Sequence, residues 1–92
     1  MLRFVWDRDK AAANLRKHGV AFDEAASAFG DPLSITVADP EHSIGEQRWL
    51  LVGQSATGRL IVVAHTEAGD EIGIISARPA TRRERQNYEE DQ

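Results

Sequence analysis

Four arginines near the C-terminal end of this 92-residue chain are its clearest candidates for chemistry on an anion: Arg78, Arg82, Arg83 and Arg85. The chain is acidic overall, with a formal net charge of −4, so solubility alone does not require this cluster. Guanidinium groups bind phosphate through paired hydrogen bonds. The cluster therefore predicts a phosphate-binding surface. The alternative interpretation is a solvated helix face on which Arg85 pairs with Glu89.

The residues around these arginines predict that a helix starts among them. Thr81 followed by Glu84 is a capping box, which places Arg82 and Arg83 in the first helical turn. Cations cost about 0.3–1 kcal/mol each at that end of a helix dipole. A helix start is also rich in free N–H groups that bind phosphate. Because Arg82 and Arg83 destabilise the start of the helix, we expect them to have a function there.

Four further side chains could take part in the same chemistry. Lys17 and His18 end a predicted helix, where the negative end of the dipole stabilises cations. His18 lies on an apolar stripe, where a histidine is more often a packed, hydrogen-bonded residue than a catalytic one. Arg48 begins a predicted strand and is either a phosphate ligand or half of a surface ion pair. His65 ends a predicted central strand and would approach Arg78 if the two strands pair.

This set of side chains suits metal-free cleavage of a phosphodiester. In that reaction a base takes the ribose 2′-hydroxyl proton, an acid protonates the leaving oxygen, and guanidinium groups hold the charge that develops on phosphorus. The chain has no cysteine, and its three histidines show no metal-ligand spacing. We therefore expect neither a metal nor a cofactor. The histidines are His18, His42 and His65.

Length and composition predict one soluble domain that spans residues 1–92. Hydrophobic residues make up 41% of the chain and charged residues 28%, as in ordinary folded proteins. No stretch approaches the length of a membrane span, and the first residues do not resemble a secretory leader. We expect a cytoplasmic protein that does not bind membranes.

The hydrophobic pattern predicts an α+β domain in the order β-α-α-β-β-β-β-α. We expect Asp7 to cap the first helix, Gly19 to stop it, and a stripe of Ala11, Leu15 and His18 to pack inward. Short turns favour an antiparallel sheet with the helices packed on one face. The predicted strands are 3–6, 33–38, 47–52, 60–66 and 71–77; the predicted helices are 7–18, 20–29 (capped by Asp23) and one that starts after Thr81.

Three blocks of sequence together resemble the BrnT toxins of bacterial type II toxin–antitoxin systems. The resemblance covers nearly the whole chain, and the Lys-His-Gly and Ile-Ile-Ser-Ala-Arg runs are specific. The first block is Phe4-x-Trp6-Asp7-x-x-Lys10 and Asn14-Leu15-x-Lys17-His18-Gly19-Val20; the second is Asp31-Pro32, Asp39-Pro40 and Glu46-x-Arg48; the third is Ile74-Ile75-Ser76-Ala77-Arg78 and Arg83-Glu84-Arg85.

The resemblance implies a RelE-like fold, with an antiparallel sheet, two N-terminal helices and a C-terminal helix packed on it. It implies a ribonuclease that needs no metal or cofactor and a BrnA-like antitoxin of the ribbon-helix-helix type. We expect a heterotetramer that contacts operator DNA only through the antitoxin. We expect Lys17, His18, Arg48, His65 and Arg78 to be catalytic, Arg82, Arg83 and Arg85 to bind RNA, and Glu46, Ser76 and Glu84 to support the site. His65 and Arg82 belong to none of the quoted motifs and are selected by their residue type and place alone.

One position departs from the family pattern. Family members commonly carry a basic residue two places before the Ile-Ser-Ala-Arg run, where this chain has Gly73. Strand alternation would place Gly73 on the face of Ile75 and Ala77, opposite Ile74. The missing cation leaves open an alternative function, a catalytically weakened module that binds the antitoxin and assists operon autorepression. A housekeeping role unconnected to RNA is a third alternative.

Overall fold

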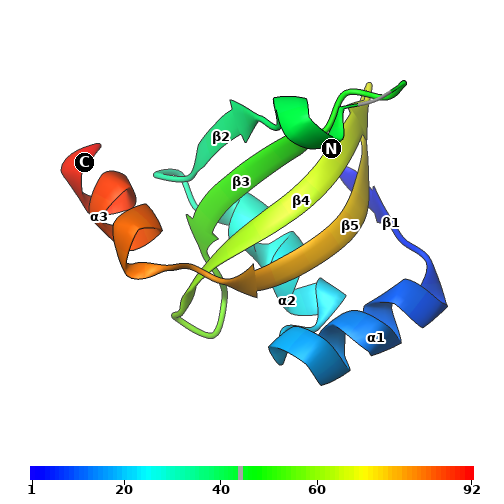
Figure 1. Ribbon diagram of the computed structural model, residues 1–92, viewed down its shortest axis with the longest axis horizontal. Helices are drawn as coiled ribbons and strands as arrows, with labels where there is room; N and C mark the ends of the chain where they lie inside the picture. The colour runs from blue at the N-terminus through cyan, green and yellow to red at the C-terminus, as the bar shows by residue number, and fades with distance from the viewer. Residues whose placement is uncertain (44) are drawn as a thin grey trace.

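The computed structural model describes residues 1–43 and 45–92, which form a five-stranded sheet and three α-helices (Figure 1). The element order β-α-α-β-β-β-β-α and the α+β class confirm the predictions from sequence. The strands are β1 Arg3–Val5, β2 Ile35–Ala38, β3 Trp49–Gln54, β4 Leu60–Ala68 and β5 Glu71–Pro79; the helices are α1 Arg8–His18, α2 Phe22–Ser27 and α3 Arg82–Glu90; the short 3₁₀ turns are η1 Ala28–Gly30 and η2 Pro40–His42.

The strands lie in the order β1-β5-β4-β3-β2. Strands β2 to β5 form an antiparallel meander, in which short turns join β3 to β4 and β4 to β5, and a longer connection that contains η2 joins β2 to β3. The prediction of a wholly antiparallel sheet is wrong at one edge, where β1 runs parallel to β5. A parallel pair requires a long connection between its strands, and the chain between β1 and β5 contains α1, α2 and three strands.

Local signals set the helix ends where the sequence predicted them. The Asp7 carboxylate accepts the N–H of Lys10 at the start of α1, and Gly19 ends the helix in the left-handed conformation, at φ 70°. Thr81 and Glu84 form the predicted capping box of α3. Asp23 was expected to cap the second helix, but α2 begins one residue before it, at Phe22, without a side-chain cap.

Helix α1 lies along the edge of β5 beyond the end of β1 (Figure 1). The buried side chain of Asn14 donates to the carbonyl of Ala77 at 2.8 Å and accepts its N–H at 3.1 Å, as a neighbouring strand would. The same amide also donates to the carbonyl of Val20. The predicted inward stripe is wrong at Leu15, which is 51% exposed, because α1 turns Asn14 toward the sheet.

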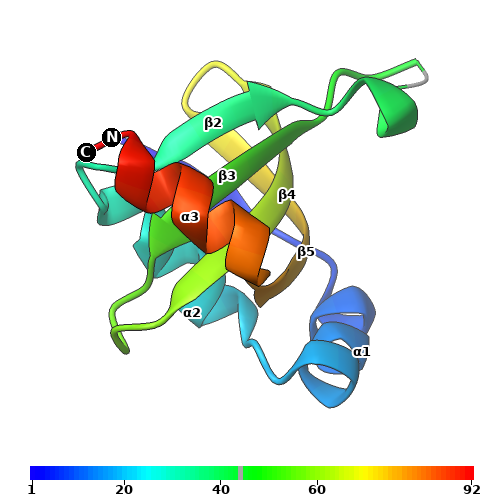
Figure 2. The same ribbon diagram turned by 60° about the vertical axis from the view of Figure 1, so that its left-hand side comes forward.

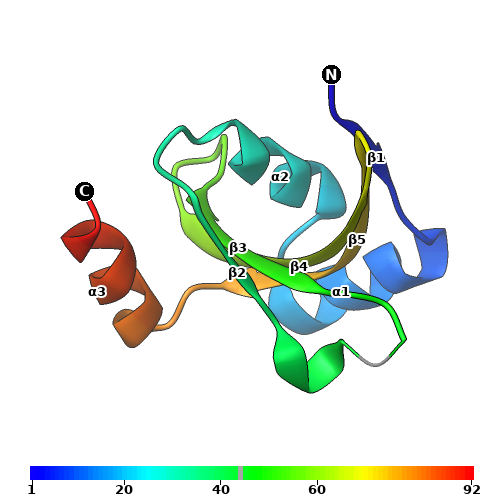
Figure 3. The same cartoon turned by 90° about the horizontal axis from the view of Figure 1, so that it is seen from above.

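The two faces of the sheet differ sharply. One face packs against α2 and η1 and contains the core, whose buried residues include Phe22, Leu51, Ile61 and Val63. Figure 3 shows α2 on this concave side and η2, drawn in green, on the other side. We call these the covered face and the open face. Figure 2 shows α3 lying across β2 and β3, so the expectation that all helices pack on one face is wrong.

A β-bulge in β5 decides which of its side chains reach the open face. Ser76 pairs with Ala64 and Ile74 pairs with His65, which leaves Ile75 as the extra residue. Both Ile74 and Ala77 consequently belong to the buried core. The expectation that Ala77 shares a face with Gly73 is therefore wrong, because the bulge reverses the alternation between them.

Helix α3 is held to the rest of the protein by its side chains. The Tyr88 hydroxyl donates to Asp31 at 2.6 Å, and this hydrogen bond raises the pKa of Tyr88. Glu84 binds Arg78, the penultimate residue of β5. Between α3 and the apolar surface of β2, β3 and β4 lies a small hollow of about 180 Å³. Within residues 1–43 and 45–92, no helix has the length and apolar character needed to cross a membrane.

Candidate active site

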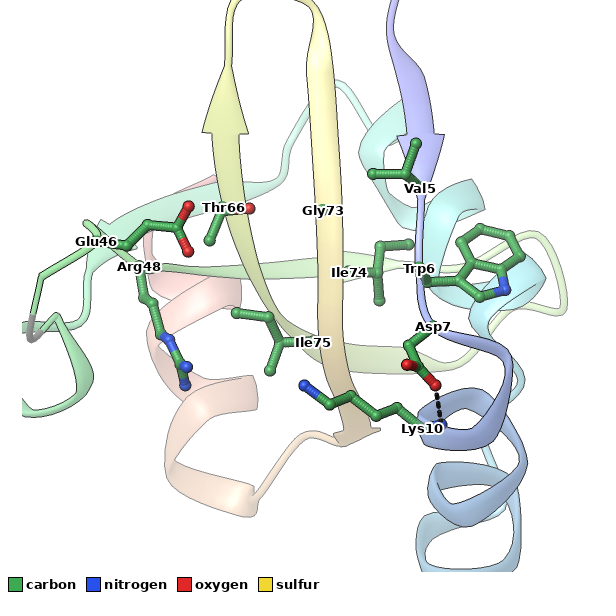
Figure 4. Close-up of a pocket in the computed structure, with 10 residues that line it drawn as sticks. All are labelled: Val5, Trp6, Asp7, Lys10, Glu46, Arg48, Thr66, Gly73, Ile74 and Ile75. Atoms are coloured by element: carbon green, nitrogen blue, oxygen red, sulfur yellow. Dashed lines mark hydrogen bonds between the residues drawn. The ribbon is translucent and has the colours of Figure 1, made fainter.

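Two adjoining hollows on the open face form a groove across β3, β4 and β5. Their volumes are about 430 and 310 Å³, and both are lined by Arg48 and Ile75. The first also contains Lys10 and Glu46, which Figure 4 shows beside β5 and β4. The second is lined by residues from η2, β3, β4 and β5 that include Asp39, His42, Ser76 and Arg78. We call the two hollows together the open-face groove.

Cations reach the middle of the open-face groove from two sides. Lys10 lies in the first turn of α1, and Figure 4 shows its ammonium group extending over β5 toward Ile75. The guanidinium of Arg48 approaches from the β3 side. Arg48 is half-buried and forms no ion pair with a described residue, whereas the other half-buried arginine, Arg78, is paired. Arg48 is therefore free to bind an anion.

Arg78 lines the same hollow as Arg48 but already holds a carboxylate. Its two terminal nitrogens donate to the two oxygens of Glu84, each at 2.8 Å. These hydrogen bonds lower the pKa of Glu84 to about 2, despite its partial burial. The same carboxylate raises the pKa of Arg78, chiefly through those hydrogen bonds. Glu84 binds the guanidinium in the paired geometry that a phosphate would use.

The groove also contains a histidine that sequence reasoning did not select. His42 in η2 is 62% exposed at its side chain, and its Nδ1 lies 2.9 Å from a carboxylate oxygen of Asp39. Lys10 belongs to a quoted motif but is not among the predicted site residues. Its place in the first turn of a helix, the feature used to select Arg82 and Arg83, was the signal that pointed to it. The signal for His42 was its place three residues after Asp39, across an Asp-Pro turn.

The structure brings together only part of the predicted site. Arg48, Glu46, Ser76 and Arg78 line the open-face groove, and Glu84 contacts it through Arg78. The remaining predicted residues lie elsewhere among the described residues: Lys17, His18, His65, Arg82, Arg83 and Arg85 line neither hollow.

His65 is a correction to the sequence analysis. Its side chain is completely buried on the covered face, where its ring packs edge-on against Phe29 at 4.8 Å. Its Nε2 lies 2.9 Å from a carboxylate oxygen of Glu67. The expected approach to Arg78 does not occur, because His65 pairs with Ile74 and the two side chains are on opposite faces. His65 has the surroundings of a core residue.

Lys17 and His18 are the last two residues of α1. Lys17 is exposed and His18 half-buried. Arg82, Arg83 and Arg85 of α3 are also exposed. None of them forms an ion pair with a described residue. The alternative pairing of Arg85 with Glu89 is therefore absent from that part of the chain. Within residues 1–43 and 45–92, no three His, Asp or Glu side chains are placed to hold a metal ion.

Comparison with known proteins agrees with this geometry. Residues 6–84 match the family model described as the ribonuclease toxin BrnT of type II toxin–antitoxin systems. The chain belongs to the BrnT family. Its fold is similar to that of the Brucella abortus ribonuclease toxin BrnT, known from a 1.1 Å crystal structure, with a TM-score of 0.59 and 23% identity over 89% of this chain and 100% of that one. No curated protein matches the sequence.

The BrnT family match covers both halves of the open-face groove. Its matched segment begins at Trp6, beside Lys10, and ends at Glu84, the partner of Arg78. Family membership indicates a ribonuclease toxin with an antitoxin partner. A ribonuclease must bind a polyanion, and Lys10, Arg48 and Arg78 supply cations to a groove whose lining also contains the carboxylates of Asp7, Asp39, Glu41 and Glu46.

Proposed function

We propose that this BrnT-family chain is a metal-independent RNA endonuclease that cuts RNA at the open-face groove. The observation that carries the proposal is the meeting of Arg48 and Arg78 in one hollow, with Lys10 reaching the adjoining one. Two guanidinium groups and an ammonium group match the charge of consecutive phosphates along an RNA strand. Lys10 and Arg48 can hold phosphate oxygens without a metal ion, and Arg78 can do so when phosphate replaces Glu84 on its paired donors.

The groove suits cleavage by the neighbouring ribose hydroxyl. The 2′-oxygen attacks phosphorus, negative charge grows on the non-bridging oxygens, and the 5′-oxygen leaves. Arg48 is oriented for this task by its place at the start of β3, where its backbone is fixed to η2. Arg78 stands on rigid β5, one strand beyond β4. Donors on rigid strands stabilise the transition state without reorganising during the reaction.

The antitoxin of this chain is proposed to be a BrnA-like ribbon-helix-helix protein, in a heterotetramer that reaches operator DNA through the antitoxin. The exposed arginines at the start of α3 have no carboxylate partner among the described residues, so an acidic segment could bind them. Such complementarity speeds encounter and would also keep RNA from the groove. We place the protein in the cytoplasm, where its RNA substrate is found.

A second function is favoured by two specific observations. Glu84 occupies the paired donors of Arg78, and Gly73 supplies no side chain to the groove. A weakened toxin that binds its antitoxin and assists autorepression would have these features. It differs from the first proposal in one measurable property, the ability to cut RNA.

Incubation of the purified protein with total RNA, with and without EDTA, tests the first proposal. We expect cleavage that survives chelation and leaves 2′,3′-cyclic phosphate and 5′-hydroxyl ends, and we expect growth arrest on induced expression. Cut ends that carry 5′-phosphate, or a strict magnesium requirement, would contradict the mechanism. Absence of both cleavage and growth arrest, with antitoxin binding retained, would favour the weakened module.

Charge reversal at the start of α3 tests the antitoxin contact. Replacing Arg82 and Arg83 by Glu should weaken the complex at low salt and make the residual affinity less sensitive to salt, because attraction would become repulsion. A matched control replaces the exposed Arg8 and Arg16 of α1 by Glu, which changes net charge equally at a distant surface. Equal affinities for the two double variants would show that α3 is not the contact.

A further inference from the structure

A histidine–carboxylate pair stands at the rim of the groove on η2. The Nδ1 atom of His42 lies 2.9 Å from Oδ2 of Asp39, whose side chain is only 14% exposed, while the histidine side chain is 62% exposed. A neutral imidazole that donates its Nδ1–H to Asp39 leaves Nε2 as a hydrogen-bond acceptor. The pair therefore has a shielded orienting carboxylate and an accessible acceptor nitrogen.

The turn that carries this pair is fixed to the start of β3. The N–H of Asp39 donates to the carbonyl of Arg48 at 2.9 Å. The Ser43 hydroxyl donates to the carbonyl of Asp39 at 2.5 Å and accepts the N–H of Arg48 at 2.9 Å. Gln47 adds a hydrogen bond from its side-chain amide to the carbonyl of Arg48. The turn that carries His42 is thus held at a set place relative to the backbone of Arg48.

His42 lines the same hollow as Arg48 and Arg78. We propose that His42 is the general base of the RNA cleavage reaction and that Asp39 is the residue that positions it. The inference rests on the proposed ribonuclease function and assigns a role within it. A stabilising surface pair would need neither a shielded carboxylate nor a place in one hollow with two arginines.

The reaction balances as a proton transfer coupled to exchange of two phosphorus–oxygen bonds. Nε2 of His42 takes the proton of the ribose 2′-hydroxyl as the 2′-oxygen forms its bond to phosphorus. The bond from phosphorus to the 5′-oxygen breaks, and water protonates that oxygen. The hydroxide so formed recovers the proton from His42. The products are a 2′,3′-cyclic phosphate and a 5′-hydroxyl, with no oxidant, reductant or other reactant.

The charges around His42 come from several elements. Asp39 and Glu41 lie beside it in the same turn, Arg48 faces the hollow from the start of β3, and Arg78 faces it from β5. Strand β4 contributes the uncharged Ala64. The neutral imidazole is the form that can act as the base.

Steady-state cleavage of a short RNA by the full chain tests the inference. His42→Ala should lower kcat by roughly 10²-fold or more, the usual contribution of a general base. KM should change little, because the arginines that bind phosphate remain, and added imidazole should restore part of kcat. His42→Asn keeps a nitrogen donor facing Asp39 but lacks Nε2, so it should be as slow as His42→Ala while preserving the turn.

The positioning role of Asp39 has its own matched control. Asp39→Asn should lower kcat with little change in KM, while Glu41→Gln, which removes the same charge two residues along the turn, should have a smaller effect. Normal kcat in a folded His42→Asn, beside slow Arg48→Ala, would overturn the inference and leave the ribonuclease proposal standing. Wild-type protein that cuts no RNA would overturn both.

Discussion

Two histidine–carboxylate pairs occupy opposite faces of one sheet and have the same nitrogen–oxygen distance, through Nε2 in His65 and through Nδ1 in His42. His65 and Glu67 approach to 2.9 Å, as do His42 and Asp39. The buried member differs: His65 is completely buried, whereas in the other pair Asp39 is shielded and His42 is exposed. A carboxylate beside a buried ring satisfies a polar core residue, while a carboxylate beneath an exposed ring orients it toward the solvent and a substrate.

The faces themselves show the same contrast. The covered face is filled by apolar side chains and α2, so its polar groups are paired internally. The open face bears a groove with cations and one half-buried arginine that forms no ion pair with a described residue. Substitutions on the covered face should therefore change stability, and those in the groove should change activity.

The largest expected effect is loss of stability from the covered face. His65→Ala should reduce the free energy of unfolding by about 3 kcal/mol, because it leaves a cavity beside Phe29 and removes the pair with Glu67. His42→Ala, the same substitution in the exposed pair, should cost less than about 1 kcal/mol. Urea unfolding curves of the two variants measure the difference. Equal losses would show that the two pairs do not differ in role.

The rate of RNA cleavage should respond to substitutions in the groove rather than to those on the covered face. Arg78→Ala should lower the cleavage rate by roughly 10²-fold or more, the effect of losing one donor to the transition state. Arg78→Lys should not restore it, because an ammonium lacks the paired geometry. The control is Glu84→Gln, which also breaks the tie to α3 but frees the guanidinium. If Glu84→Gln is as slow as Arg78→Ala, the arginine acts by holding α3 in place.

Local features of this fold were predictable from sequence, and contacts between distant segments were not. Asp7, Gly19 and the Thr81–Glu84 box each act on backbone groups within a few residues, so their patterns fixed helix ends correctly. The bulge at Ile75 has no such signal, because it depends on how β4 and β5 pair. The predicted strand alternation therefore assigned Ala77, which follows the bulge, to the wrong face of the sheet.

The candidate site was predictable to a similar extent. Arg48 and Arg78 were selected by charge and spacing, and both line the groove. His65 was selected because it ends a strand, but sequence could not show which face it occupies. Lys10 and His42 were not selected, because only tertiary structure brings α1 and η2 to opposite ends of one groove. Roles for all of these residues remain predictions.

Acid should weaken the covered side through Glu24. Hydrogen bonds from Arg59 come first among the causes that lower the pKa of Glu24 to about 2, and the Thr57 and Ser55 hydroxyls add to them. A carboxyl with a lowered pKa in the folded state stabilises the protein above its usual pKa of 4.5 and loses that contribution as the pH falls toward 2.

The expected size of this contribution is about 1–2 kcal/mol, after allowance for solvent screening of the half-exposed Arg59. Glu24→Gln should therefore be less stable than wild type at pH 7 and nearly equal to it at pH 2. The exposed Glu90→Gln is the control and should be neutral at both pH values. Chemical unfolding at the two pH values measures the free energy of unfolding of each variant. If wild type and Glu24→Gln differ by the same free energy at both pH values, the linkage to the pKa of Glu24 is refuted.

The smallest expected effect concerns Gly73, which lines the groove but has no side chain. Sequence reasoning predicts that Gly73→Arg increases RNA binding or cleavage and stabilises β5 slightly. The structure contradicts the second part, because a Cβ at Gly73 would lie 2.6 Å from Oγ1 of Thr66. Thr66 must turn away, so we expect Gly73→Arg to cost about 1 kcal/mol of stability. Adding Thr66→Ala should recover that cost, since the remaining contact is 3.9 Å.

The charge at this position should still strengthen RNA binding. Gly73 lines the first hollow with Lys10 and Arg48, so a guanidinium there would add a third cation to that hollow. Gly73→Gln in the Thr66→Ala background gives a side chain of comparable length without charge. RNA affinity at several salt concentrations separates the two: the arginine variant should bind more tightly and depend more steeply on salt. Equal affinity and equal salt dependence for both variants would mean that RNA does not pass over Gly73, and the path of the strand would then lie across Arg48 and Arg78 alone.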